Sequence, residues 1–172
     1  MKLLFYALAA AIILGSCQQK FRDGIVINEI CGKDKDGLEW IEIGNASQQD
    51  MSLKDYKLVK TDEEGIEKTI YKFPDTLLAA GQIIAINGES LKAHIPNKKA
   101  VMIELLDAEG NVVDSFDSQQ ELDLEGHAKG QSYGRIPDLV GEWTLCEHAT
   151  WNAPNASSSS DDEDLDFDED ED

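Results

Sequence analysis

Histidine, serine and cysteine could supply a nucleophile or a base in this chain, and their spacing decides whether they form a catalytic site. The three histidines, His94, His127 and His148, are far apart in the sequence. None belongs to a Gly-x-Ser-x-Gly, His-Glu-x-x-His or Gly-rich phosphate-binding motif, the patterns that pair a nucleophile with a base or hold a metal or a phosphate. We interpret each histidine as solvated or half-buried. The sequence therefore predicts no catalytic residue, no cofactor and no enzymatic activity.

Cys17 ends a segment that is typical of export signals. Lys2 supplies a positive start, residues 3–14 form an apolar core, and a Leu-Gly-Ser-Cys ending follows. The core is shorter than the about 20 residues that a membrane-spanning helix needs, and signal peptides end at small residues. The ending resembles the lipobox of bacterial lipoproteins, in which the cysteine is lipidated and becomes the mature N-terminus. This predicts a lipoprotein signal peptide over 1–17, an acyl anchor on Cys17 and a polar tether over 18–23.

The residue after the anchor bears on localisation. Gln18, rather than Asp, follows Cys17, and this resembles lipoproteins sorted to the outer membrane of Gram-negative cells. We therefore expect a lipid-anchored protein of the bacterial cell envelope, in the outer membrane.

Cys31 and Cys146 would enter an oxidising compartment after export. Three states remain open for them: a disulfide that ties the first strand to the last, two free thiols, or a metal site. Cys146 and His148 are two residues apart on a strand and would point to the same side, so that Cys31 could be a third zinc ligand. Because no fourth ligand is evident and the compartment favours oxidation, we predict the disulfide and no metal.

The elements that would position these residues are short β-strands. Runs of β-branched and aromatic residues recur about every 8–12 residues between Gly, Pro and Asp turns, without a long amphipathic helix, which is typical of a β-sandwich. The expected strands are 24–30, 38–43, 51–59, 68–73, 83–87, 101–106, 112–116, 131–136 and 142–146. We expect loops at 32–37, 88–99 and 119–129, and a lipid on Cys17 would hold these loops near the membrane.

Four motifs resemble the lamin tail domain family and occur in the family's order. They are Ile-Asn-Glu-Ile at 27–30, Glu-Trp-Ile-Glu-Ile-Gly-Asn at 39–45, Leu-x-Asp-x-x-Gly-x-Val-Val-Asp at 105–114, and Ser-Tyr-Gly-Arg-Ile-Pro-Asp at 132–138 with a closing segment to residue 155. The resemblance implies an all-β, immunoglobulin-like sandwich of lamin-tail type over 24–155. It also implies a structural signature formed by Asn28, Glu29, Trp40, Glu42, Gly134, Arg135, Pro137, Asp138, Trp143, Thr150 and Asn155.

The chain departs from the family pattern in its last motif. Leu139 stands where the family has Gly, which predicts a reshaped turn after Asp138. Trp151-Asn152 replaces Pro-Gly, and Asn tolerates the left-handed backbone conformation that Gly would adopt, so this turn can survive.

Three carboxylates and one arginine are the remaining candidates for a site. Glu29, Glu39 and Glu42 lie on neighbouring early strands and could cluster, although exposed sheet positions are the interpretation we favour. Arg135 could bind a ligand carboxylate, but the excess of acidic residues favours a structural ion pair.

Charge limits the class of partner. The chain has 35 acidic and 15 basic residues, and ten of the acidic residues lie in 161–172. This balance disfavours nucleic acid, whose phosphates need basic surfaces. We interpret 156–172 as a disordered Ser-rich and acidic tail that could bind calcium weakly.

The expected function is therefore a non-enzymatic module that is anchored to the membrane by its N-terminal lipid and binds a protein or a glycan. The alternatives are a divalent-cation-dependent binding protein that uses the acidic tail, and an accessory subunit of a surface hydrolase.

Overall fold

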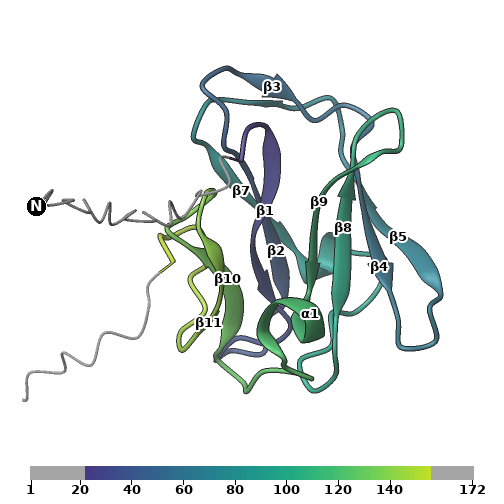
Figure 1. Cartoon of the computed structure of the whole chain (residues 1–172), viewed down its shortest axis with the longest axis vertical. Coiled ribbons are helices and arrows are strands. Elements are labelled where there is room, and N and C mark those ends of the chain that lie inside the picture. Colours follow the sequence, from purple (N-terminus) through teal and green to yellow (C-terminus); the bar gives the residue numbers. More distant parts are fainter. Residues whose placement is uncertain (1–21, 156–172) are drawn as a thin grey trace, which may run out of the picture.

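The computed structural model describes residues 22–155, which fold into two antiparallel β-sheets packed face to face (Figure 1). The signal peptide over 1–17 with Cys17, most of the 18–23 tether and the 156–172 tail are predictions that lie outside the described residues. None of the helices between residues 22 and 155 is long and apolar enough to cross a membrane.

The first sheet has five strands in the order β11-β10-β1-β2-β7. They span Ile25–Cys31 (β1), Trp40–Asn45 (β2), Ile83–Asn87 (β7), Ser132–Ile136 (β10) and Glu142–Cys146 (β11). The second sheet has four strands in the order β5-β4-β8-β9. They span Lys57–Thr61 (β4), Glu67–Lys72 (β5), Met102–Leu106 (β8) and Val112–Asp117 (β9). The predicted immunoglobulin-like β-sandwich is confirmed.

The smaller elements lie at the ends of the sandwich. β3 (Met51–Ser52) pairs with β6 (Leu77–Leu78) at one end, whereas η1 (Gly88–Ser90) and α1 (Ser118–Leu122) lie towards the other (Figure 1). Asp117 caps α1 by accepting hydrogen bonds from the backbone of Gln119 and Gln120. Residues 119–129 were expected to be a loop throughout, and this cap explains why their first turn is helical.

The core lies between the sheets and consists of side chains from both inner faces. Its fully buried members include Ile27, Ile30, Ile41 and Ile43 from the first sheet, and Leu58, Ile70, Ile103, Leu105 and Phe116 from the second. Burying one such side chain stabilises a fold by about 1.5–3 kcal/mol. The core therefore fixes the position of both sheets and of the loops that leave them.

Two strand predictions needed correction. The expected single strand 51–59 is split into β3 and β4, because Asp55 has a φ of 63° and turns the chain between them. The expected strand 38–43 is observed as β2 over Trp40–Asn45, because Gly44 pairs with Val26 and Asn45 with Ile25.

β1 contains a bulge that matters for the site. Ile27 pairs with Ile43, whereas the next pairing joins Glu29 to Glu42, so Asn28 is the extra residue. An extra residue of this kind shifts which side chains face the core. As a result Ile27 and Ile30 both lie in the core, and Glu29 lies on the outer face of the sheet.

The three long loops lie at one end of the sandwich, and the chain enters at the other. β1 begins near residue 22 at the end that carries β3 and finishes beside the loops 32–37, 88–99 and 119–129 (Figure 1). We expected an anchor on Cys17 to hold these loops near the membrane. In the described residues the loops lie at the end of the sandwich opposite to residue 22, where β1 begins.

Candidate functional site

The pair Glu29 and Glu42 is buried, which corrects the expectation that these carboxylates are exposed. The two residues are directly opposite each other on β1 and β2, and both are 0% exposed. An alternating strand at the surface usually turns its polar residues to water. Here residues 150–155 cross the outer face of the sheet and cover them, a contact that strand periodicity does not reveal.

Buried carboxylates hold this closing segment through its backbone. Glu29 accepts hydrogen bonds from Thr150 N at 2.9 Å and from Thr150 Oγ1 at 3.0 Å. Glu42 accepts from Asn152 N at 2.8 Å and from Asn28 Nδ2 at 3.1 Å. We call Asn28, Glu29, Glu42 and residues 150–155 the C-terminal clasp. All four carboxylate oxygens have protein partners, so the clasp is a structural device.

The last residue of the clasp explains two more signature positions. Asn155 Nδ2 donates to Asn28 O at 3.3 Å and to Arg135 O at 3.2 Å, and Asp138 accepts from Asn155 N at 3.2 Å. A Cβ added at Gly134 would lie 2.8 Å from Asn155 Nδ2. Glycine is therefore the residue that lets the segment approach β10 so closely.

The two residues that depart from the family pattern in the last motif, Leu139 and Asn152, both have a left-handed backbone conformation. Asn152 has a φ of 52° and Leu139 a φ of 65°. Asn28 Oδ1 accepts a hydrogen bond from Leu139 N at 2.8 Å, and the Leu139 side chain fills the space above Gly44. Contact with neighbours thus holds a conformation that is uncommon for leucine. Pro137 is exposed at this turn.

Burial changes the acidity of the clasp. It raises the pKa of Glu42 to about 7, with a further contribution from the negative charge of Glu29. It also raises the pKa of Glu29, against hydrogen bonds that favour the carboxylate. Both shifts have the same physical cause, because water is excluded from two like charges on adjacent strands.

Arg135 forms the structural ion pair that its acidic surroundings predicted. Its guanidinium is fully buried and donates to both oxygens of Asp114 at 3.0 Å, to Ile27 O at 2.8 Å and to Gly141 O at 3.2 Å. It also lies 4.2 Å above the ring of Trp143. Asp114 comes from β9 and Arg135 from β10, so the pair ties the two sheets together.

Cys31 and Cys146 are free and buried, and the predicted disulfide is wrong. β10 lies between their strands, β1 and β11. Strands two positions apart are separated by about 10 Å, whereas a disulfide needs Cα atoms within about 7 Å. Among residues 22–155, no group of three or more Cys, His, Asp or Glu side chains is arranged to hold a metal ion. Sequence alone did not reveal the intervening strand.

We predict that both thiols react slowly while the protein is folded. Burial raises the pKa of Cys31 far above its usual range and that of Cys146 to about 11, so little thiolate exists at neutral pH. In a Cys17→Ala variant that has not been reduced, a thiol reagent should count two thiols after denaturation and close to none before it. A count of zero thiols after denaturation would show that Cys31 and Cys146 form a disulfide.

The three long loops meet at one end of the sandwich and contact one another. His127 Nε2 accepts a hydrogen bond from Gly32 N at 3.0 Å, and His127 N donates to Asn97 O at 2.7 Å. Gly130 N donates to Lys33 O at 2.9 Å. His127 is buried, and burial lowers its pKa. This histidine is therefore a structural link between loops, and we call this region the loop end.

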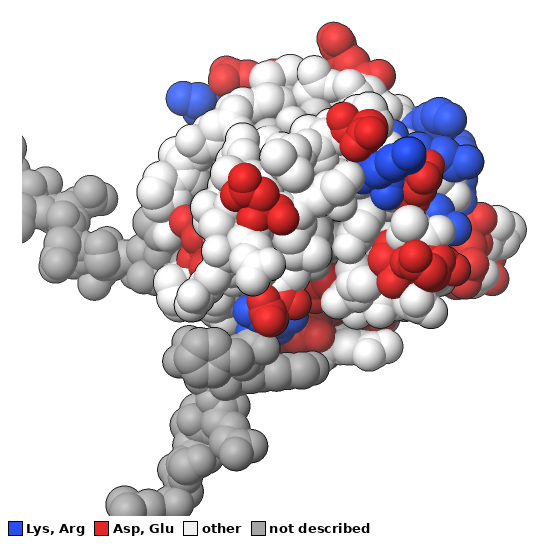
Figure 2. Space-filling view, turned by 90° about the horizontal axis from the view of Figure 1, so that it is seen from above, with Lys and Arg blue, Asp and Glu red and all other residues white. Residues whose placement is uncertain are grey.

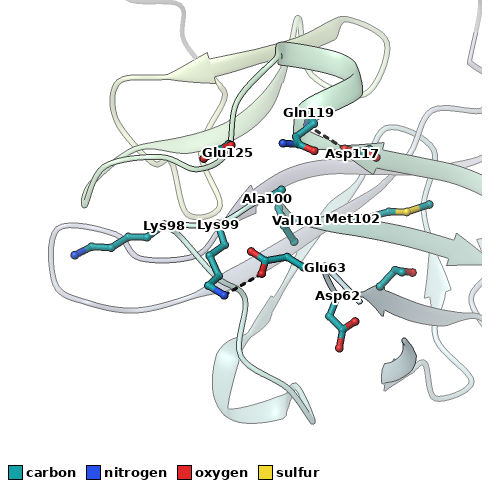
Figure 3. Close-up of a pocket in the computed structure, with 11 residues that line it drawn as sticks. Asp62, Glu63, Lys98, Lys99, Ala100, Val101, Met102, Asp117, Gln119 and Glu125 are labelled. Atoms are coloured by element: carbon teal, nitrogen blue, oxygen red, sulfur yellow. Dashed lines mark hydrogen bonds and ion pairs between the residues drawn. The ribbon is translucent and has the colours of Figure 1, made fainter. Parts of the chain in front are cut away.

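One hollow at the loop end has a volume of about 460 Å³ and is lined mostly by charged side chains (Figure 3). Glu63 pairs with Lys99 at 3.0 Å. Asp62 accepts from the backbone of Glu64 and Ile66, and Asp117 caps α1. Because turns, a cap and an ion pair occupy these carboxylates, few groups are left here for a ligand.

A second hollow, of about 710 Å³, has more of the features of a binding site, and we call it the indole hollow. Leu38 and Trp151 supply apolar surface to it, and Glu39, Asn87, His94 and Asn97 supply polar groups. Glu39 pairs with His94 and accepts a hydrogen bond from Ile95 N at 2.9 Å. Ligand sites combine apolar lining with a few placed polar groups.

Sequence reasoning named Glu39, His94 and Trp151 separately but did not bring them together in one hollow. Leu38, Asn87 and Asn97 carry no motif, and their proximity arises only when loops far apart in sequence converge. One signal was present in Trp151, a large aromatic residue at a position where the family resemblance implies Pro. Trp40 lies beneath it, with the two rings 5.1 Å apart in an edge-to-face arrangement.

Comparison with known proteins agrees with this architecture. A search of curated proteins finds no match. The family model described as Lamin Tail Domain matches residues 18–120, which is more than half of the chain and includes the first three of the four motifs. This family consists of immunoglobulin-like, non-catalytic domains. The chain belongs to the lamin tail domain family.

Proposed function

We propose that this protein is a bacterial envelope lipoprotein whose lamin tail domain binds a protein or a glycan at its loop end and catalyses no reaction. One observation carries the proposal: the loops 32–37 and 88–99 and the closing segment line an open hollow, and the loop 119–129 with the adjoining Gly130 holds those two loops through hydrogen bonds of His127 and Gly130. Rigid scaffolds that present loops are a common arrangement for binding.

The histidines support binding rather than catalysis. His127 is buried and bonded to loop backbone, and His94 is exposed and paired with Glu39. His148 lines another hollow together with Trp151. The side-chain partners of His127 and His94 are backbone groups and Glu39, and neither includes a serine or cysteine that could act as a nucleophile.

Surface charge favours a partner other than nucleic acid. Figure 2 shows the end of the sandwich that carries β3, where basic side chains gather at one side and acidic side chains lie beside and among them. On the second sheet Lys57 is opposite Lys72 and Lys60 is opposite Lys68. A group of this size is bordered by acidic residues, whereas binding to phosphate backbones uses extended basic surfaces.

Membrane attachment is tested by the change Cys17→Ala. The wild-type protein should sediment with membranes, and the variant should move to the soluble fraction, because the acyl chains are the expected attachment. Fractionation followed by immunodetection measures this. Unchanged membrane partition of the variant would contradict the lipoprotein assignment.

Binding is tested at the loop end with exposed residues. The double change Glu89→Ser and His94→Ala should abolish capture of a partner from envelope extract while lowering stability by less than about 1 kcal/mol, as is usual for surface changes. The matched control is Glu109→Ser with Asn111→Ser, which are exposed at the opposite end. Equal capture by both variants and the wild type would contradict a binding role for the loop end.

A further inference from the structure

An exposed apolar ridge separates the indole hollow from a neighbouring hollow. Trp151 and Leu38 line both the indole hollow and a neighbouring hollow of about 540 Å³. Trp151 is 40% exposed and Leu38 is 58% exposed. Single exposed apolar residues are ordinary, but two that border the same pair of hollows form a continuous contact surface.

The C-terminal clasp holds the Trp151 ring in place. The residues on either side of it are bonded through their backbone to buried carboxylates, Thr150 to Glu29 and Asn152 to Glu42. The ring itself packs edge-to-face on Trp40. A ligand that packs on this indole would therefore pay little conformational entropy, which is the advantage of a rigid aromatic anchor.

Polar groups surround the ridge on both sides. In the indole hollow, the side-chain oxygen of Asn87 accepts hydrogen bonds from Ser90 N and Ser90 Oγ. Its amide nitrogen is therefore available to donate to a ligand. Asn97 and Glu39 add further amide and carboxylate oxygens. Across the ridge, His148 and Lys35 line the second hollow. Donors and acceptors are thus arranged around a flat apolar face.

We infer that Trp151 and Leu38 form the platform of a binding site for a neutral oligosaccharide, an inference that rests on the proposed binding function of the loop end. A sugar ring has an apolar C–H face that can pack on an indole and hydroxyl groups at its edge that pair with amides and carboxylates. Two hollows on either side of one platform fit a chain of more than one ring.

The same features disfavour a peptide or a nucleic acid. The indole hollow lies at the ends of β1, β2 and β7 and is reached by loop residues such as Leu38 and Asn97. It therefore offers no row of backbone groups for an added strand. Its charged lining includes Glu39 and Glu89 as well as Lys33, so no excess of positive charge is present for phosphates.

The test uses calorimetric titration of the full chain carrying Cys17→Ala with neutral trisaccharides of N-acetylglucosamine, glucose or mannose. At least one should bind, and Trp151→Ala should weaken that affinity at least tenfold. Leu38→Ser should also weaken it several-fold, and this change leaves the clasp bonds untouched. The matched control is Ile66→Ala, which removes another apolar residue that is 58% exposed, on the β4–β5 hairpin; its affinity should equal that of the parent.

The two proposals fail in different ways. If no trisaccharide binds but capture from envelope extract still depends on Glu89 and His94, the glycan site is wrong and the loop end binds something else. If Trp151→Ala abolishes capture of a protein while no sugar binds, the ridge is a protein-binding surface and the inference is overturned. If Ile66→Ala weakens sugar binding as much as Trp151→Ala, the site is elsewhere. If neither sugar binding nor loop-dependent capture is found, both proposals fall.

Discussion

Replacing Arg135 with methionine should lower the free energy of unfolding by about 3–5 kcal/mol, the range for removing one partner of a buried ion pair. The change leaves the Asp114 carboxylate without its bidentate partner and removes donors from Ile27 O and Gly141 O. It also removes the cation above Trp143. Urea denaturation followed by tryptophan fluorescence measures the loss.

Arg22 provides a matched control for this experiment, because it pairs with the same Asp114 oxygen at 3.0 Å but is partly exposed. Arg22→Gln should cost clearly less than Arg135→Met, because Asp114 keeps both hydrogen bonds from Arg135. The double variant Arg135→Met with Asp114→Leu should cost less than the sum of the two single changes, since the ion pair between these side chains can be lost only once. A loss below about 1 kcal/mol for Arg135→Met would contradict the tie between the sheets.

Glu42 should make the domain less stable as the solution becomes more alkaline. The pKa of Glu42 is raised from 4.5 to about 7 in the folded protein. The folded state therefore binds this proton more tightly, so the contribution is fully present below about pH 4.5 and is lost as the pH rises through about 7. Between about pH 5 and pH 8 the loss should be about 2–3 kcal/mol.

A Glu42→Gln variant isolates this contribution from other titrating groups. Glu29 has a raised pKa and acts in the same sense, whereas the lowered pKa of His127 stabilises the fold as the pH rises towards 6.5. Subtracting the variant's pH profile from that of the wild type removes the part that both share. Glutamine places an amide group against the Asn28 amide, so the variant should be less stable than the wild type near pH 5. Near pH 8 it should be more stable, because glutamine cannot ionise whereas Glu42 carries a buried charge there.

The control for the pH experiment is Glu109→Gln, an exposed change that should leave the profile unaltered. Stability should be measured by urea denaturation at each pH. If the difference between Glu42→Gln and the wild type is the same at every pH, the clasp carboxylate does not titrate in this range.

The bounds of a strand could be predicted where the residues of the strand and its flanking turns determine them. The bounds of β7 and β11 agree with the expected residues 83–87 and 142–146, because short runs rich in β-branched, aromatic and other apolar residues lie there between turn signals. The strand 51–59 was not predicted correctly, since the left-handed Asp55 that divides it is an aspartate without a turn motif around it. Local reasoning also missed the α1 turn.

The candidate site was less predictable because its contacts are long-range. Arg135 could be assigned a structural partner from charge balance, but not Asp114 in particular. The burial of Glu29 and Glu42 depends on residues 150–155, which are more than 100 positions away. The separation of Cys31 from Cys146 depends on strand order. Composition gives the residue types of such contacts, and only the fold gives their geometry.

If Cys17 carries the proposed lipid, the direction of β1 would separate the loop end from the lipid surface. Its seven residues span about 23 Å, and the five steps from Cys17 to Arg22 add at most about 18 Å when fully extended. A domain anchored through Cys17 would thus hold Trp151 well beyond the lipid headgroups. Polymers that stand away from the bilayer would then be within its reach.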